Sequence, residues 1–203
     1  YILLGEYGVL FVVGRLLGWY ASAADFGAQN SFDPTLLYLI ARTTTAIFGT
    51  ATVLLVYFIG KLAYGRPTGL VAAVFLAVTF LHVRDSHFAV NDIALTFFTT
   101  LAVLASVGIA QSGKWRGYAV AGLALGLGFA TKYSAVLALA PVIVAHLFAR
   151  FAPKGIAAPA TWRQLAGALG IAAIAAIVAS PYFVIVPGKV IRDVYEALYL
   201  AGQ

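Results

Sequence analysis

The side chains that could do chemistry concentrate in one short polar stretch, His82–Asp92. These eleven residues include two histidines, an arginine, two aspartates and an asparagine, and they predict a loop. Asp92 stands just before the apolar run that begins at Ile93. Aspartate there favours an N-cap, because its carboxylate accepts a backbone N–H and suits the positive end of the helix dipole. The carboxylate could also orient an acceptor or bind a divalent cation, and these roles are compatible.

Arginine and histidine complete the polar set of this stretch. Arg84 is either one half of a solvated ion pair with Asp85 or a contact for phosphate, which a planar guanidinium binds well. His82 and His87 have no third ligand at a metal-binding spacing, so a zinc site is not expected. His87 is better interpreted as a polar contact in a cleft.

A second candidate is the lone lysine of Thr131-Lys132-Tyr133, which separates two apolar runs. Such a lysine can simply extend its amine to the membrane surface, or it can contact the phosphate of a lipid headgroup. Tyr133 is either an aromatic-belt residue or a substrate contact. The residues alone leave both pairs of interpretations open.

The elements that position these side chains must lie in lipid. Apolar residues make up 63% of the 203-residue chain and charged residues 10%, against about 45–50% and about 25% in soluble domains. The net charge of +6 could suggest nucleic acid, but the basic residues are spread singly and form no patch. Nucleic-acid binding is therefore not expected. The absence of cysteine excludes disulfides and zinc–thiolate sites from this chain.

Apolar runs of membrane-spanning length alternate with short polar connections. A spanning helix needs about 20 mainly apolar residues. Six runs approach this length: Leu36–Ile59, Thr68–Val83, Ile93–Ala110, Gly117–Thr131, Tyr133–Ala149 and Leu165–Ile185. We predict an all-α polytopic membrane protein with a single transmembrane domain whose helical bundle covers residues 36–185.

The two ends of the chain differ from the spans. Glu6 and Arg15 interrupt the first apolar run, which favours a helix at the membrane interface over a true span. Residues 1–35 are accordingly predicted as a juxtamembrane, extracytoplasmic segment. A Pro-Gly pair at 187–188 should end the last span, and residues 186–203 predict an amphipathic interfacial helix.

Charge predicts the orientation in the membrane, because basic residues in short loops mark the cytoplasmic face. If the spans alternate, one face receives seven basic residues and no acid: Lys61, Arg66, Lys114, Arg116, Arg150, Lys154 and Arg163. The opposite face receives all the acids, together with four basic residues: Glu6, Asp25, Asp33, Asp85, Asp92, Asp193 and Glu196, with Arg84, Lys132, Lys189 and Arg192. The second face is therefore predicted to be extracytoplasmic, and it holds both candidate sites.

Other positions carry structural expectations. Gly122, Gly126 and Gly128 lie at near-helical spacing, which predicts close helix packing. Arg42, near the extracytoplasmic end of the first span, is expected to pair with an acid or a phosphate. His146, near the cytoplasmic end of the fifth span, is expected at the membrane interface.

Three segments in order resemble those of GT-C superfamily glycosyltransferases that use polyprenyl-phosphate sugars. Residues Arg42–Thr50, with the Val-Tyr and Tyr-Gly pairs that follow, look like their second transmembrane region. Ser86–Phe98 (SHFAVNDIALTFF) resembles their second extracytoplasmic loop, where an aspartate opens the next helix. Ala121–Tyr133 (AGLALGLGFATKY) is similar to their G-L-x-x-G-L-A-x-x-T-K segment. The resemblance covers roughly Leu36–Pro181 and points to the protein O-mannosyltransferase and aminoarabinose-transferase-like branch.

The resemblance implies an inverting transfer of a sugar from a polyprenyl-phosphate donor to a lipid, glycan or protein acceptor, outside a bacterial or archaeal cell membrane. Asp92 matches the second-loop aspartate, which implies a supporting catalytic role or ligation of a divalent metal ion. Lys132 matches the motif lysine, which implies a phosphate contact. His87 and Tyr133 lie at the ends of these two segments and Arg84 lies just before the first of them, and all three are expected to bind substrate.

The chain departs from this family at its principal catalytic acid, which lies in the first extracytoplasmic loop, often as an Asp-Glu pair. No Asp-Glu pair occurs here, and the chain has no methionine, so we expect a fragment that begins after that loop. The alternative from another class is a transporter or lipid flippase. The centres of the predicted spans carry almost no charge, which favours chemistry at one face over alternating access.

Overall fold

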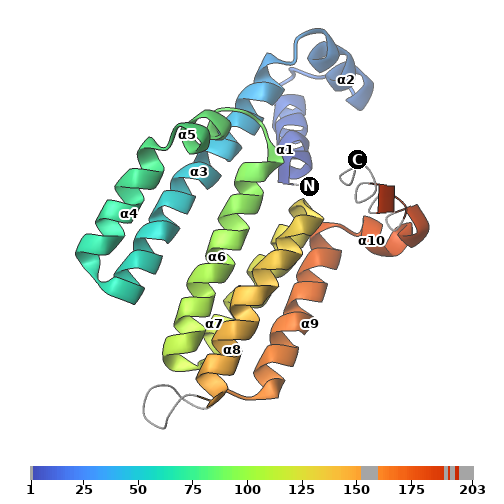
Figure 1. Cartoon of the computed structure of the whole chain (residues 1–203). Helices are drawn as coiled ribbons and strands as arrows, with labels where there is room; N and C mark the ends of the chain where they lie inside the picture. Colours follow the sequence, from blue (N-terminus) through green and yellow to red (C-terminus); the bar gives the residue numbers. More distant parts are fainter. Residues whose placement is uncertain (1, 152–159, 190–191, 193–194, 197–203) are drawn as a thin grey trace.

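The computed structural model is an all-α bundle (Figure 1) that describes residues 2–151, 160–189, 192 and 195–196. Its helices are α1 (Ile2–Leu16), α2 (Ala23–Phe32), α3 (Thr35–Tyr64), α4 (Arg66–Val78), α5 (Phe80–Ser86), α6 (Asn91–Ser112), α7 (Trp115–Thr131), the 3-10 helix η1 (Tyr133–Ala138), α8 (Leu139–Phe151), α9 (Trp162–Ala179) and α10 (Tyr182–Ile185). These ranges contain no strand. Most of the interfacial helix predicted for 186–203 lies outside the described residues.

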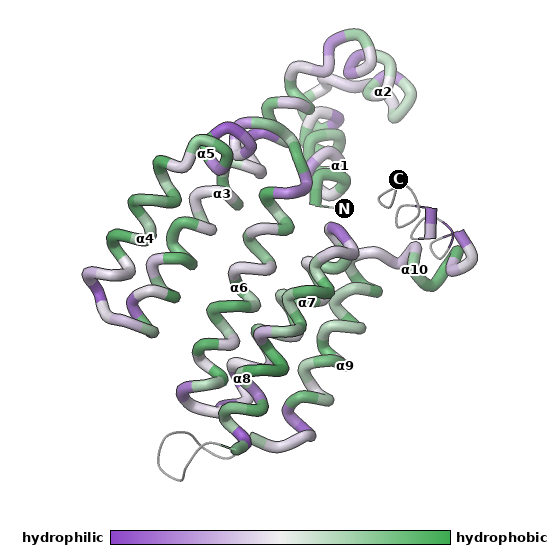
Figure 2. Tube along the Cα trace, in the orientation of Figure 1, coloured by the Kyte–Doolittle hydropathy of each residue, from purple (hydrophilic) through white to green (hydrophobic). Residues whose placement is uncertain are grey.

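Four helical segments are long and apolar enough to cross a membrane: α3, α6, the continuous η1–α8 segment and α9, with the bent pair α4–α5 as a fifth. The prediction of an all-α polytopic membrane protein is confirmed. Helix α7 has 17 residues, or about 26 Å, slightly less than a hydrocarbon core of about 30 Å. It nevertheless returns beside α6 from one end of the bundle to the other (Figure 1). Hydrophobic residues cover the helices, and hydrophilic residues gather at the two ends (Figure 2).

The two ends differ in charge. At the end where α6 stops and α7 starts, the described charged residues are basic: Lys61, Arg66, Lys114, Arg116, Arg150 and Arg163. We call this the basic end. The connections there are tight, because Gly65 and Gly113 adopt positive φ values of 100° and 59°, which glycine tolerates best. The opposite end, where α6 starts and α7 stops, carries Asp85, Asp92 and Lys132, and we call it the acidic end.

The second predicted span, Thr68–Val83, is wrong as a single helix. It is bent by 63° between α4 and α5. The Thr79 N–H bonds Leu76 O, and the Thr79 hydroxyl donates to the Phe75 carbonyl that a continued helix would have bonded. The predicted loop His82–Asp92 is therefore largely helical, because α5 covers its first five residues and α6 its last two.

The last predicted span, Leu165–Ile185, is also too long. Helix α9 ends at Ala179, and Ser180 leaves the helical region with φ −139° and ψ 79°. Proline disfavours helical backbone in the residue before it, so Pro181 explains this break. The prediction that the Pro-Gly pair at 187–188 ends the last span was therefore wrong. Pro141 has a related effect, because its ring opposes a regular helix in the preceding turn, which is the 3-10 helix η1.

Small residues hold the centre of the bundle together. Methyl groups added at Gly122 and Gly126 of α7 would overlap the carbonyls of Ala168 and Ala172 of α9. An added methyl at Gly128 would press on Ala135 at 3.1 Å and on Phe98 at 3.3 Å. The predicted close packing at these glycines is confirmed.

His146 does not lie at an interface. It is fully buried, and its Nδ1 is 2.7 Å from the hydroxyl of Tyr118, which is also fully buried. The expected interfacial position was wrong, because α7 and Trp162 cover this face of α8 with Tyr118 and an indole 4.9 Å from the imidazole. The pair therefore contributes to the core near the basic end.

The N-terminal helices lie beside the first part of α3 (Figure 1). Helix α1 has 15 residues, fewer than a span needs. Its Tyr7 hydroxyl donates to Leu37 O at 3.2 Å, which joins α1 to α3. Helix α2 begins after Ser22, whose hydroxyl accepts the Asp25 N–H as an N-cap. The position of α1 relative to a membrane stays a prediction.

Candidate functional site

An ion pair joins the two strongest sequence candidates at the acidic end. Lys132 Nζ lies 2.8 Å from Asp92 Oδ1, although 40 residues separate them. Asp92 lies in the first turn of α6, and Lys132 is the C-cap residue that follows α7. The N-cap prediction for Asp92 was wrong: the N-cap is Val90, without a side-chain cap. The Asp92 carboxylate binds the lysine instead.

Electrostatics keep Lys132 charged. The hydrogen bond from Lys132 to Asp92, and then the charge of that carboxylate, raise the pKa of the lysine above its ordinary value of 10.5. Both side chains are substantially exposed, at 41% for Lys132 and 56% for Asp92. Exposed ion pairs contribute only about 0–1 kcal/mol. A phosphate can therefore replace the carboxylate as the partner of the lysine at little expense in stability.

A cleft of about 520 Å³ opens beside this pair. The volume lies in the range of about 300–1,000 Å³ that is usual for ligand sites. Its polar lining residues are Thr44, Thr45, Asn91 and Thr131, and its apolar lining residues are Ile2, Leu3, Phe48, Ala89, Val90, Ala94, Phe98, Leu127, Ala130 and Ala179. Asn91 and Thr131 are the chain neighbours of Asp92 and Lys132. The ion pair thus stands next to the cleft wall.

A carboxylate that sequence reasoning did not select also belongs to this region. Glu6 of α1 accepts hydrogen bonds from the Thr44 hydroxyl at 2.7 Å and 2.9 Å, one at each carboxylate oxygen. Thr44 itself lines the cleft. The sequence signal was present, because an acid in an apolar run is rare and tends to be functional. Its partner, however, could not be read from the sequence.

The other predicted site residues lie at the same end but are engaged separately. Arg84 Nε bonds Asp85 Oδ1 at 2.7 Å, so the predicted ion pair is confirmed. His87 Nδ1 lies 2.7 Å from Val83 O within its own helical turn. Tyr133, 37% exposed, directly follows Lys132. Their substrate-binding roles remain predictions, since the ion pair and the cleft lining do not include them.

Helix α5 is held on α3 by close contact. His82 Nε2 donates to Gly49 O at 3.1 Å, and the Ser86 side chain packs where a Cβ of Gly49 would lie. His82 therefore serves this junction. Arg42, also on α3, is exposed and makes no ion pair within the described ranges, so its expected acidic partner is not found there.

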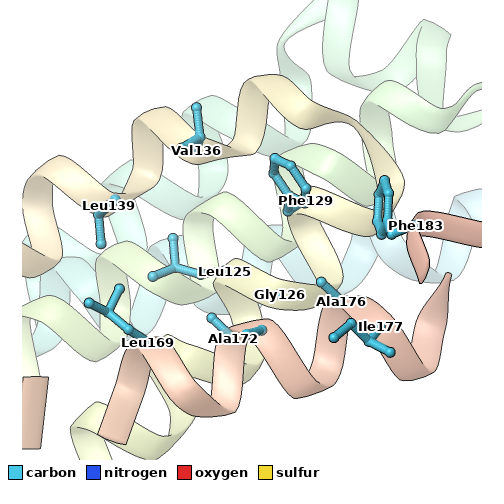
Figure 3. Close-up of a pocket in the computed structure, with 11 residues that line it drawn as sticks. Leu125, Gly126, Phe129, Val136, Leu139, Leu169, Ala172, Ala176, Ile177 and Phe183 are labelled. Carbon is cyan, nitrogen blue, oxygen red and sulfur yellow. The ribbon is translucent and has the colours of Figure 1, made fainter. Parts of the chain in front are cut away.

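A second, wholly apolar pocket of about 330 Å³ lies between α7, η1–α8, α9 and α10 (Figure 3). Phe129 and Phe183 stand at one end of it, and Leu125, Leu139 and Leu169 lie further along (Figure 3). Phe129 is one helical turn before Lys132. The pocket is therefore within short reach of the ion pair.

The described residues do not form a metal site of their own. No group of three or more His, Asp or Glu side chains comes together in the parts of the chain that the structure covers. The Asp92 carboxylate, the candidate ligand, is already bound to a cation, Lys132. A divalent ion would need most of its ligands from substrate phosphate or water.

Comparison with known proteins identifies the family of the chain. Residues 37–185 match the family described as dolichyl-phosphate-mannose-protein mannosyltransferase. The chain is also similar to a Pyrococcus furiosus protein named dolichyl-phosphooligosaccharide-protein glycotransferase 2, with 29% identity over 131 residues that cover 62% of this chain and 18% of the relative. The chain thus spans about a fifth of that curated relative. No solved structure matches it. Because the family match covers most of its length, the chain belongs to the dolichyl-phosphate-mannose-protein mannosyltransferase family, within the GT-C superfamily of glycosyltransferases.

Proposed function

We propose that this chain forms the donor-binding part of a membrane glycosyltransferase. The enzyme would transfer a sugar from a polyprenyl-phosphate donor to a lipid, glycan or protein acceptor, with inversion, at the acidic end of the bundle. The observation that carries the proposal is the Asp92–Lys132 pair at 2.8 Å beside a cleft whose lining includes the polar residues Thr44, Thr45, Asn91 and Thr131. An amine that is charged at neutral pH suits a phosphate in that position. The acidic end would face the extracytoplasmic side, in agreement with the positive-inside rule.

The reaction needs stabilisation of its leaving group. As the acceptor hydroxyl attacks the anomeric carbon, it gives its proton to a carboxylate that acts as general base. The bond from this carbon to the phosphate oxygen breaks at the same time, and charge grows on the phosphate. Lys132 would stabilise that charge, because an ammonium already in place needs no reorganisation. Asp92 would hold the amine in position before binding and then, released by the phosphate, support the orientation of the acceptor. Arg84, His87 and Tyr133 would contact the substrate from the same rim.

The apolar pocket suits the lipid part of the donor. Its lining residues are all apolar (Figure 3), and one of them, Phe129, precedes Lys132 by one helical turn. A polyprenyl chain attached to a phosphate at Lys132 would therefore pass Phe129 and bury its first isoprene units between α7 and α9. Burial of apolar surface contributes about 25 cal/mol per Å², so this contact would supply affinity without chemical selectivity.

The proposal is tested with the intact protein in lipid nanodiscs. Transfer of a radiolabelled sugar from mannosyl or glucosyl dolichyl phosphate is measured for the wild type and for Lys132→Ala. Loss of a charge-assisted bond of about 1.5–3 kcal/mol should lower transfer by about ten- to a hundredfold. The matched control is Lys114→Ala, which removes a lysine at the basic end and should leave transfer unchanged.

Two results would contradict the proposal. One is equal transfer by Lys132→Ala and the wild type. The other is movement of dolichyl phosphate across the membrane by a wild-type protein that transfers no sugar, which would favour a flippase.

A further inference from the structure

We propose that Glu6 and Thr44 form the subsite that recognises the hydroxyl groups of the donor sugar. This inference rests on the proposed function and adds a residue on α1 that none of the resembling motifs includes. The starting observation is a carboxylate whose two oxygens both accept from one threonine hydroxyl, at 2.7 Å and 2.9 Å. Thr44 lines the cleft that stands beside the Asp92–Lys132 pair.

The position of Glu6 on its helix also supports this assignment. Ile2 and Leu3 of α1 line the cleft. Glu6 follows them by four and three residues, so it lies on the same face of the helix, one turn along. Its side chain is half-buried, and its only described polar partner is the neutral Thr44. A carboxylate in this setting keeps unused acceptor capacity, because ionised glutamate offers about four lone-pair sites.

The chemistry matches a sugar better than other parts of the substrate. Hydroxyl groups are donors that a carboxylate can accept, whereas a phosphate or an isoprene unit offers it nothing. The sugar is bonded directly to the phosphate, so a phosphate at Lys132 delivers the sugar to the adjoining wall, where Asn91 and Thr131 lie. Thr44, on α3, lines the same cleft, and its hydroxyl oxygen can still accept a bond while it donates to Glu6.

The competing interpretation is that Glu6 only attaches α1 to α3. The structure offers a control for it, because Tyr7 makes a separate α1–α3 hydrogen bond, from its hydroxyl to Leu37 O at 3.2 Å. If attachment is the whole role, Tyr7→Phe and Glu6→Gln should act alike. Thr43→Val provides a second control, since the sole bond of the Thr43 hydroxyl among the described residues is to Leu39 O of its own helix.

The experiment compares the affinity of the intact protein for dolichyl phosphate with its affinity for mannosyl and glucosyl dolichyl phosphates of the same chain length. The wild type should bind at least one of the sugar-bearing lipids more tightly than the sugar-free lipid. Glu6→Gln and Thr44→Val should lower this sugar-dependent gain by about tenfold or more, because a hydrogen bond to a charged group is lost or weakened. Both should keep the wild-type affinity for dolichyl phosphate, and Tyr7→Phe and Thr43→Val should keep both affinities.

Several outcomes overturn the assignment. They are a gain that persists in Glu6→Gln, a wild type that shows no gain, and a Tyr7→Phe variant that loses the gain as fully as Glu6→Gln does. A wild-type protein that does not bind dolichyl phosphate would instead refute the proposed function on which the assignment rests.

Discussion

At the scale of single residues, the ion pair between Asp92 and Lys132 is exposed and therefore contributes little to stability. In the proposed function the carboxylate and an incoming phosphate would compete for the same amine, since both are anions. We predict that Asp92→Asn tightens the binding of sugar-free dolichyl phosphate severalfold but lowers the rate of sugar transfer at least about tenfold. Affinity and kcat, measured separately, check this split. A parallel loss of both would show that the carboxylate only holds the lysine in place.

The protonation of Lys132 leads to a second prediction at this scale. Because Asp92 raises the pKa of the Lys132 amine above 10.5, the lysine stays charged well above neutral pH. Affinity for dolichyl phosphate should therefore not fall between about pH 7 and about pH 9 on account of this residue. In Lys132→His the affinity should fall as the pH rises through about 6.5, where imidazole loses its charge. Titration of the dissociation constant distinguishes the two proteins.

The buried Tyr118–His146 pair supports the core and not the site. Tyr118→Phe would leave His146 Nδ1 without its partner at 2.7 Å, in a place that water does not reach. We predict a loss of about 1–3 kcal/mol in the free energy of unfolding, seen as a lower midpoint of thermal unfolding in detergent. Tyr133→Phe, at an exposed tyrosine, is the matched control and should unfold like the wild type.

At the scale of helices, the sequence predicts the long apolar helix α3 but not the bend between α4 and α5. The apolar run of α3 was predicted as Leu36–Ile59 and forms a helix over Thr35–Tyr64, because hydropathy alone determines such a segment. The bend at Thr79 was not predicted, since the run Thr68–Val83 has no proline inside it and its sole glycine, Gly69, is near the start. It depends on a side-chain hydrogen bond and on the packing of α5 against α3, which hydropathy does not contain.

The junction of α5 with α3 can be tested at Gly49. An added methyl group there would overlap the Ser86 side chain, so α5 would have to move. We predict that Gly49→Ala destabilises the protein by about 1–3 kcal/mol. In α6, Gly108 has no atom within 4 Å of the same added methyl. Gly108→Ala should therefore be neutral or stabilising by up to about 1 kcal/mol, because alanine is the better helix former. Equal thermal stability of the two variants would argue against a tight junction.

At the scale of the whole molecule, alternation of spans predicted that Asp92 and Lys132 share one end, and the structure confirms it. Alternation could not predict that the two side chains touch, because that depends on α7 returning directly against α6. The contact of Glu6 is likewise not predictable from the sequence. Its contact with Thr44 joins residues 38 positions apart, and nothing in either local sequence specifies such a pairing. The sequence thus indicates the end of the bundle where the candidate site residues gather, whereas packing determines which of them meet there.

The orientation of the bundle in the membrane can be tested by labelling single introduced cysteines, because this chain contains no cysteine of its own. Phe88 precedes α6 and is 50% exposed, and Lys114 follows α6 and is also exposed. The 22 residues of α6 extend about 33 Å, enough to cross the hydrocarbon core. Phe88→Cys should therefore react with a membrane-impermeant maleimide on intact cells, and Lys114→Cys only after permeabilisation. Labelling of both from one side would show that α6 does not cross, and the acidic end would then lose the sidedness that a lipid-linked donor requires.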